Sequence, residues 1–226
     1  IKEQLKKIGG LEFFDVHFSY IDLEDGEERY VSTPENGGSA LIPEGEMQAG
    51  SLYGIAHQPG DGQIGLVRLD LQVMAGNGKF THTGFGSGSA ISDELKEAVN
   101  YCRSNLSRIT QASKFSESEM HMKATDINGI GTLQGLELAV FVSLVSGLTG
   151  RALQPQMCVL GSMSIGGTII PTSDLAGALQ IAADAGAKRI LLPVADMMQY
   201  SKVPADLVSK FSLEIYSDPV DAAFKA

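Results

Sequence analysis

Hydrophobic positions follow two helical patterns in the middle of the chain. A Ser92-Asp93-Glu94 cap precedes a segment whose apolar residues recur every three or four positions, which predicts a helix with one buried face. The apolar positions of that face are Leu95, Val99, Cys102 and Leu106. The second segment, from Gly135 to Gly147, is apolar nearly all round, which predicts a helix buried on every side.

Alternating or short apolar runs predict strands on both sides of these helices. Residues 11–33 have the pattern of a β-hairpin, with Asp25-Gly26 as its turn. Residues 51–83 are expected to form strands interrupted at 59–62 and at 76–78. Further strands are predicted at Met120–Thr125, within 157–170 and at Arg189–Leu192.

The last third of the chain combines strands and helices in turn. Asp174 is expected to cap a helix that ends at Gly186. A short helix near 204–211, a strand at 213–216 and a final helix from Pro219 are predicted to follow. Strands and helices that interleave in this way predict an α/β fold, or an α+β fold in two layers.

A Pro-, Gly- and Glu-rich stretch from Thr33 to Gly50 predicts a linker or surface loop. We therefore expect an N-terminal hairpin and linker over residues 1–49 and one larger domain over 50–226. The chain starts at Ile1 rather than Met, which is the expected appearance of a piece of a longer protein.

Composition and charge narrow the function classes. With 43% hydrophobic residues the chain can bury a substantial core, and its net charge of −10 disfavours a surface that binds nucleic acid throughout. Cys102 and Cys158 do not have the spacing of a metal site, so we interpret them as two thiols in a reducing cytoplasm. The longest apolar stretch, 136–148, is too short and too polar to span a bilayer.

Three sequence runs carry the strongest functional signal. The first, residues 144–150, reads LVSGLTG and ends the long apolar helix. The second, residues 166–171, reads GGTIIP and is followed by Asp174-Leu175-Ala176. The third, residues 184–193, reads DAGAKRILLP. In this order the three runs resemble those of the proteolytic domain of Lon proteases, and the resemblance extends over residues 50–226.

The resemblance implies a fold like that of the Lon proteolytic domain, but with empty catalytic positions. Lon proteases carry a nucleophilic Ser fifteen residues before the last Gly of the first run, which corresponds here to Gly135. Their general base is a Lys five residues after the Pro of the second run, which corresponds to Ala176. Neither side chain can attack a carbonyl or accept a proton. The resemblance also implies that the N-termini of the helices at Gly135 and Leu175 face each other.

Nearby residues were considered as substitutes for the missing Ser and Lys. Thr132 lies three residues before Gly135, and we interpret its hydroxyl as a helix cap. Ser173 precedes Asp174 and is interpreted as a turn or cap residue. Ser143 lies two helical turns beyond Gly135. Lys188 follows the next helix, and Lys123 is expected to face solvent on a strand.

Other motifs give weaker signals. Residues 76–80, GNGKF, differ from a phosphate-binding P-loop and are interpreted as a hairpin turn. The glycine-rich segment 84–88 precedes a helix, where it could hold an anion or form a simple loop. The four histidines are scattered, and no metal or catalytic role is assigned to them; they are His17, His57, His82 and His121.

A second resemblance covers nearly the whole chain. Residues 1–50, together with 160–168 and 216–222, resemble the Lon-related proteins of the BREX phage-exclusion system. This resemblance implies a preceding AAA+ ATPase region that binds ATP and Mg²⁺, and assembly of the full protein into homo-oligomeric rings on DNA in the cytoplasm. For this chain itself no cofactor, metal or membrane contact is expected.

We therefore expect a non-catalytic Lon-like C-terminal domain that acts in the assembly and interactions of a phage-defence ATPase. The alternative is an ATP-dependent serine peptidase domain with a displaced nucleophile, for which Thr132 and Ser173 are the available hydroxyls.

Overall fold

The computed structural model describes residues 18–21, 28–31, 41–60, 62–86, 89–111 and 115–226. The chain forms two compact units, Ile1–Ser39 and Ala40–Ala226. In the first, β1 (Phe18–Ile21) pairs antiparallel with β2 (Glu28–Val31). The predicted hairpin is confirmed by this pairing, while its predicted turn at Asp25-Gly26 lies outside the described residues.

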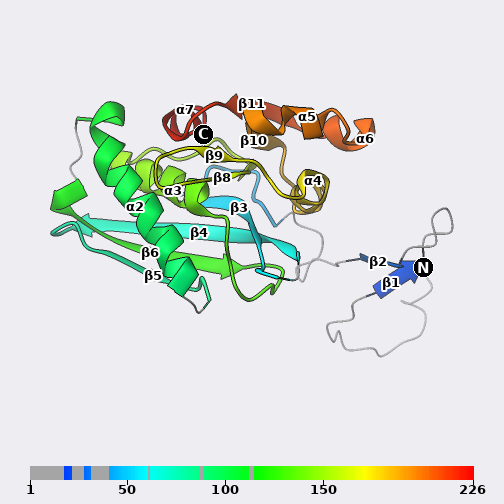
Figure 1. Ribbon diagram of the computed structural model, residues 1–226, viewed down its shortest axis with the longest axis horizontal. Helices are drawn as coiled ribbons and strands as arrows, with labels where there is room; N and C mark the ends of the chain where they lie inside the picture. Colours follow the sequence, from blue (N-terminus) through cyan, green and yellow to red (C-terminus); the bar gives the residue numbers. More distant parts are fainter. Residues whose placement is uncertain (1–17, 22–27, 32–40, 61, 87–88, 112–114) are drawn as a thin grey trace. The chain divides into compact units, whose positions relative to one another are not determined.

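The second unit is built on a mixed seven-stranded sheet with the strand order β11-β10-β7-β3-β4-β6-β5 (Figure 1). The strands are β3 (Leu52–His57), β4 (Ile64–Ala75), β5 (Phe80–Thr83), β6 (Ser118–Asp126), β7 (Met157–Val159), β10 (Arg189–Pro193) and β11 (Ser212–Tyr216). β3, β4 and β6 are antiparallel neighbours, whereas β3, β7, β10 and β11 run parallel. A separate two-stranded hairpin joins β8 (Ser162–Met163) to β9 (Ile169–Ile170).

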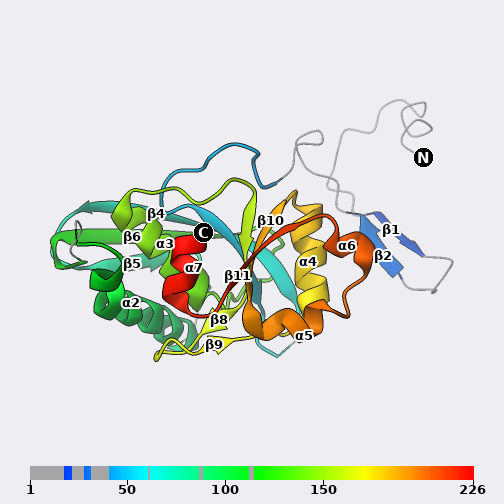
Figure 2. The same cartoon turned by 90° about the horizontal axis from the view of Figure 1, so that it is seen from above.

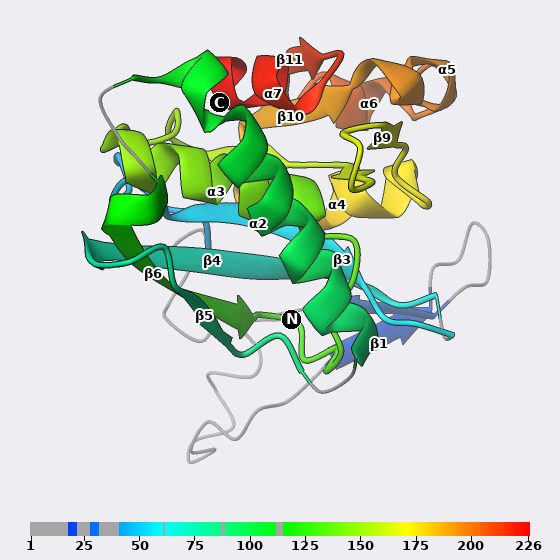
Figure 3. The ribbon, with the colours of Figure 1, turned by 60° about the vertical axis from the view of Figure 1, so that its left-hand side comes forward.

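The main helices are α2 (Ser89–Ile109), α3 (Glu137–Thr149) and α4 (Leu175–Asp184). α2 and α3 cover the same face of the sheet, as Figure 3 shows. Shorter helical segments complete the unit: η1 (Phe115–Glu117), η2 (Val194–Asp196), α5 (Met197–Tyr200), α6 (Ala205–Val208) and α7 (Pro219–Lys225). The β8–β9 hairpin lies between α2 and α5 (Figure 2).

Alternation along β3 separates two hydrophobic cores. Leu52 and Ala56 point into the core shared with α2 and α3, whereas Tyr53 packs in the core that contains α4. Side chains of a strand point alternately to opposite faces, so β3 serves both cores. Segment 41–49 belongs to this unit, because Ile42 is fully buried and its N–H donates to Ala185 O at 2.9 Å. The domain limits 1–49 and 50–226 stay a prediction.

Two buried serines of α3 form hydrogen bonds with the segment that enters β3. Ser143 Oγ donates to Gly50 O at 2.6 Å, and Gly50 N–H donates to Ser146 Oγ at 2.8 Å. These bonds remove the cost of burying two hydroxyls in an otherwise apolar helix. They also give Ser143 a structural role. None of the helices in the described part of the chain is long and apolar enough to cross a membrane.

Three sequence predictions about local structure were wrong in detail. α2 begins at Ser89 rather than after Ser92, and α3 begins at Glu137 rather than at Gly135, which has a φ of 78°. Residues 76–78 do not form a hairpin turn, because β6 lies between β4 and β5. Gly76 N–H and Gly78 N–H donate to Glu117 O and Ser118 O, so this turn crosses the start of β6 instead.

Candidate functional site around Gly135 and Ala176

The first candidate position, Gly135, directly follows Gln134, which forms an isolated β-bridge with the last residue of β3. His57 N–H donates to Gln134 O at 3.0 Å, and Gln134 N–H donates to His57 O at 3.1 Å. The chain then turns at Gly135 with a positive φ and enters α3. Residues other than glycine rarely adopt this backbone conformation, so the sequence change at this position also changes the backbone it permits.

The imidazole of His57 occupies the space where a side chain at position 135 would point. An ideal Cβ built on Gly135 would lie 2.6 Å from His57 Nδ1 and 2.7 Å from His57 Cε1. These separations are far shorter than van der Waals contact, so a serine cannot stand there unless the ring moves. Burial lowers the pKa of His57, which keeps the ring neutral near pH 7.

The second candidate position, Ala176, lies in the first turn of α4 and is exposed. Asp174 caps this helix as predicted, because its Oδ1 accepts a hydrogen bond from Gly177 N–H at 2.9 Å. A Cβ on Gly177 would lie 2.9 Å from Cδ1 of Ile64. Ile64 is the cross-strand partner of His57.

Positions 135 and 176 therefore both lie near the loop end of the β3–β4 hairpin, where His57 pairs with Ile64. His57 contacts the Gly135 side of this corner, and Ile64 contacts the first turn of α4. This arrangement agrees with two helix starts that approach each other. The separation of the Gly135 and Ala176 Cα atoms stays a prediction.

Two carboxyl groups surround the start of α3. Glu94 Oε2, from α2, accepts a hydrogen bond from Gly135 N–H at 3.2 Å. Burial, followed by the charge of Glu137, raises the pKa of Glu94 to about 7. Burial also raises the pKa of Glu137, the first residue of α3, whose Oε2 has no hydrogen-bond partner among the described residues. Within those residues no Lys or Arg forms an ion pair with either carboxyl.

The N–H of Gly135 has a partner that bears on acyl-transfer chemistry. Enzymes that attack a carbonyl stabilise the developing oxyanion with backbone N–H groups near the nucleophile. Here the N–H of Gly135 is already bonded to a carboxyl group.

The hydroxyls of Thr132 and Ser173 are not hydrogen-bonded to a general base in the described residues. α3 has Leu136 at its N-cap position and no side-chain cap bond, so the prediction that Thr132 caps this helix was wrong. Thr132 lies instead against Gly86, with its N–H bonded to Ile130 O at 3.2 Å. Ser173 is exposed and lies directly before the Asp174 cap. No hydrogen bond between either hydroxyl and a titratable side chain occurs in the described residues.

The remaining candidates lie elsewhere. Lys123 is exposed on β6, as predicted, and Lys188 is exposed beside β10. His121 Nδ1 and Thr81 Oγ1 share a 2.8 Å hydrogen bond on the sheet. In the ranges that the structure describes, no three His, Cys, Asp or Glu side chains are arranged to hold a metal ion. In segment 84–88, Phe85 is buried, and residues 87–88 lie outside the described part.

Sequence reasoning missed His57, Glu94 and Glu137 as neighbours of Gly135. A charged residue inside an otherwise apolar helix, such as Glu137, is a signal that could have been used. The role of His57 has no comparable local signal, because it depends on the pairing of β3 with residue 134.

Comparison with known proteins agrees with this geometry. Residues 37–225 match the model of the Lon protease (S16) C-terminal proteolytic domain. The chain is 47% identical over its whole length to the Lon-like protease BrxL of Escherichia coli O9:H4 (strain HS), of which it covers 32%. It is 43% identical, again over its whole length, to the Lon-like protease BrxL of Bacillus cereus (strain H3081.97), of which it covers 33%.

More distant relatives include the Lon protease of Methylocella silvestris, which is 28% identical over 184 residues, 78% of this chain and 22% of that protein. The chain spans about a third of the length of the two BrxL relatives. The chain has a mixed β-sheet in an α/β fold, carries the three sequence runs in order, and matches the family model over nearly all of Ala40–Ala226. It therefore belongs to the family of the Lon protease (S16) C-terminal proteolytic domain.

Proposed function

We propose that this Lon-family domain does not cleave peptide bonds and serves in the assembly and interactions of a larger AAA+ ATPase of a BREX phage-defence system. One observation carries the first half of the proposal. The His57 ring fills the space at Gly135 where the family's nucleophile would project. Packing, as well as residue type, therefore supports the absence of this chemistry.

The general base that Lon proteases use, a lysine, also has no counterpart at position 176. Ala176 has no titratable group, and it lies exposed in the first turn of α4. A serine nucleophile needs a neighbouring base to lose its proton at neutral pH. In the described part of the chain no titratable side chain is hydrogen-bonded to the hydroxyl of Thr132 or Ser173, which supports the absence of a substitute dyad.

Exposed apolar side chains support the role in interaction. Near the β8–β9 hairpin and α5, several large hydrophobic residues remain exposed, while Phe224 on α7 is 62% exposed. The exposed residues of the first group are Ile165, Ile170, Val194, Met197 and Met198. Exposed apolar groups of this kind are typical of protein contact surfaces.

A ring provides such contacts without strong pairwise affinity. Identical domains that meet through heterologous interfaces close into a ring when the rotation between neighbours permits it. Tethering each domain to an ATPase unit raises the effective concentration of its neighbours, so weak contacts become sufficient. In this proposal ATP and Mg²⁺ act in the ATPase region, and DNA is a partner of the complete protein.

The chemical half of the proposal is tested on the full-length protein with ATP. We expect no cleavage of casein or of peptides, and no labelling of residues 40–226 by a fluorophosphonate probe. Thr132→Ala and Ser173→Ala variants provide the matched controls. Cleavage that either substitution abolishes would overturn the proposal and establish a displaced nucleophile.

The assembly half requires a comparison of full-length protein with a version that lacks residues 40–226. We expect analytical ultracentrifugation to show a smaller oligomer for the truncated protein, while ATP hydrolysis per ATPase unit changes less. Identical oligomers in both proteins would remove the assembly role.

One alternative function has some support. The BrxL relatives carry the name Lon-like protease, which favours a serine peptidase for those proteins. For this chain, that function requires a nucleophile other than residue 135, and the fluorophosphonate experiment would locate it.

A further inference from the structure

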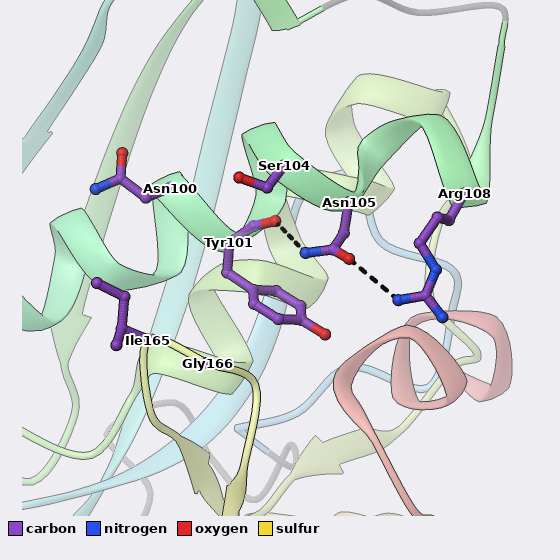
Figure 4. Close-up of a pocket in the computed structure, with 7 residues that line it drawn as sticks. All are labelled: Asn100, Tyr101, Ser104, Asn105, Arg108, Ile165 and Gly166. Atoms are coloured by element: carbon purple, nitrogen blue, oxygen red, sulfur yellow. Dashed lines mark hydrogen bonds between the residues drawn. The ribbon is translucent and has the colours of Figure 1, made fainter.

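A surface pocket of about 430 Å³ lies between α2 and the tip of the β8–β9 hairpin (Figure 4). None of the residues around Gly135 and Ala176 line it. Its walls are formed by Asn100, Tyr101, Ser104, Asn105, Arg108, Ile165 and Gly166. The polar side chains come from successive turns of one face of α2, and the lining contains no acidic residue.

Two packing contacts position the aromatic ring of Tyr101, which lines this pocket. The Tyr101 ring makes an edge contact with Phe141 of α3, with 5.2 Å between centroids and 78° between planes. Gly167 also packs against the Tyr101 ring, so closely that a Cβ on Gly167 would overlap it. Gly167 also has a φ of 81°, which favours glycine. The position of the Tyr101 hydroxyl is therefore fixed by packing.

The guanidinium of Arg108 is oriented by a neighbouring amide. Arg108 Nη1 donates to Asn105 Oδ1 at 3.1 Å, and Asn105 Nδ2 donates to the backbone O of Tyr101 at 3.0 Å. Both ends of the Asn105 amide are thus used to position Arg108 against α2, as Figure 4 shows. Guanidinium has five N–H donors, and no carboxylate pairs with Arg108 among the described residues.

Two acidic residues, Asp218 and Glu97, lie near the pocket but do not line it. Asp218 lies close enough to Tyr101 to influence it, but its Oδ1 accepts the N–H groups of Val220 and Asp221, each at 3.0 Å. Glu97, one turn before Tyr101 on α2, lies near Glu137 and Glu94, and its negative charge raises the pKa of both. The pocket lining therefore presents hydrogen-bond donors and one guanidinium without an ion-pair partner among the described residues, with the charge of Asp218 nearby.

We propose that this pocket binds an oxyanion, either a carboxylate or a phosphate group, between the Arg108 guanidinium and the Tyr101 hydroxyl. Ser104 and Asn100 are further donors from the same helix face. Ile165, which is 60% exposed at the rim, contacts the apolar part of the bound molecule. Arginine is suited to this role because its planar fork matches the oxygens of carboxylates and phosphates.

The test uses the 226-residue chain, with inorganic phosphate and acetate as separate probes at constant ionic strength. We expect saturable shifts of the amide NMR signals of Tyr101, Asn105 and Arg108 with at least one probe. Saturation by phosphate alone assigns a phosphoryl ligand, and saturation by acetate alone assigns a carboxylate. The absence of saturable shifts with both probes would overturn the proposal.

Two arginines on α2 allow a matched comparison. Arg108→Gln should weaken binding at least about tenfold, because a charge-assisted hydrogen bond is lost. Arg103→Gln removes the same charge from the same helix, where the guanidinium lies 4.9 Å from the Phe115 ring centroid, and should leave binding unchanged. Equal weakening by both substitutions would show that overall charge, not the pocket, attracts the anion.

Two further variants separate positioning from direct contact. Tyr101→Phe keeps the packed ring and removes one donor, so binding should fall several-fold without loss of stability. Asn105→Ala leaves Arg108 in place but unsupported, and should weaken binding while the thermal unfolding midpoint and the dispersed NMR spectrum show an intact fold. Full binding by both variants would contradict the proposed arrangement of donors.

Discussion

The starts of α3 and α4 differ in how much space each leaves for a side chain at positions 135 and 176. At the start of α3 the place of the nucleophile is closed: Gly135 has a positive φ, the His57 ring lies against it, and Glu94 accepts its N–H. At the start of α4 the place of the base is open: Ala176 is exposed in an ordinary helix capped by Asp174. Packing against His57 restricts a side chain at position 135, whereas position 176 is open to solvent.

This difference gives the two positions different tolerance to substitution. A side chain at 135 must displace a ring and adopt a strained backbone, whereas a longer side chain at 176 extends into solvent. Restoring the dyad would therefore require changes beyond the two dyad residues.

The largest effect is expected for Gly135→Ser. A positive φ and an overlap with His57 together should destabilise the fold by about 2–4 kcal/mol, as measured by urea denaturation. The overlap alone is relieved in a His57→Ala background, so the two substitutions should couple by about 1 kcal/mol or more. Strict additivity would mean that His57 does not fill this space.

The buried carboxyl groups at the start of α3 predict a pH dependence of stability. In the folded protein the pKa of Glu94 is about 7, whereas the ordinary pKa of a glutamate is 4.5. The folded state therefore binds more protons between these values, and the contribution of Glu94 to stability is lost as pH rises from 4.5 to 7.

Glu94→Gln keeps an acceptor for Gly135 N–H and removes the charge. After a discount for partial exposure, it should stabilise the protein by about 1–2 kcal/mol at pH 8 relative to its effect at pH 4. Chemical denaturation at the two pH values measures this difference. Asp93→Asn, at an exposed neighbouring acid paired with Lys96, is the control and should show little of it. A flat pH response for both would contradict the raised pKa.

The cap of α4 should have a smaller effect. Asp174→Ala removes the acceptor for Gly177 N–H and should cost about 1 kcal/mol of unfolding free energy. Leu136→Ala is unsuitable as a comparison because Leu136 is buried, so Asp218→Ala at the capped start of α7 is the matched variant. If only Asp218→Ala destabilises the protein, the Asp174 bond contributes nothing to the stability of α4.

The smallest effect is expected for Ala176→Lys. An exposed position in the first turn of α4 should accept lysine within about 0.5 kcal/mol, measured by the same denaturation experiment. Without a hydroxyl at 135, this variant should also gain no peptidase activity. A destabilisation comparable with that of Gly135→Ser would show that the base position is as closed as the nucleophile position.

Much of the fold could be predicted from local patterns. The strands at 52–57, 64–75 and 189–193, the capped helix at 175–184 and the buried helix after residue 135 follow from hydrophobic spacing, glycine and capping residues. The turn at 76–78 could not be assigned correctly, because its partner is β6 and not the next strand in sequence. Helix starts were also misplaced, since α3 begins without a capping side chain.

Local sequence patterns are sufficient for the class of fold, the order of the three Lon-like runs and the absence of Ser and Lys at 135 and 176. Which side chains surround position 135 depends on the tertiary structure. Glu94 reaches Gly135 from 41 residues away, and His57 arrives through the pairing of β3 with Gln134. The α2–hairpin pocket likewise depends on Gly167 packing against Tyr101. Periodicity reports which face of an element is buried, but only the packing of distant elements decides which side chains meet there.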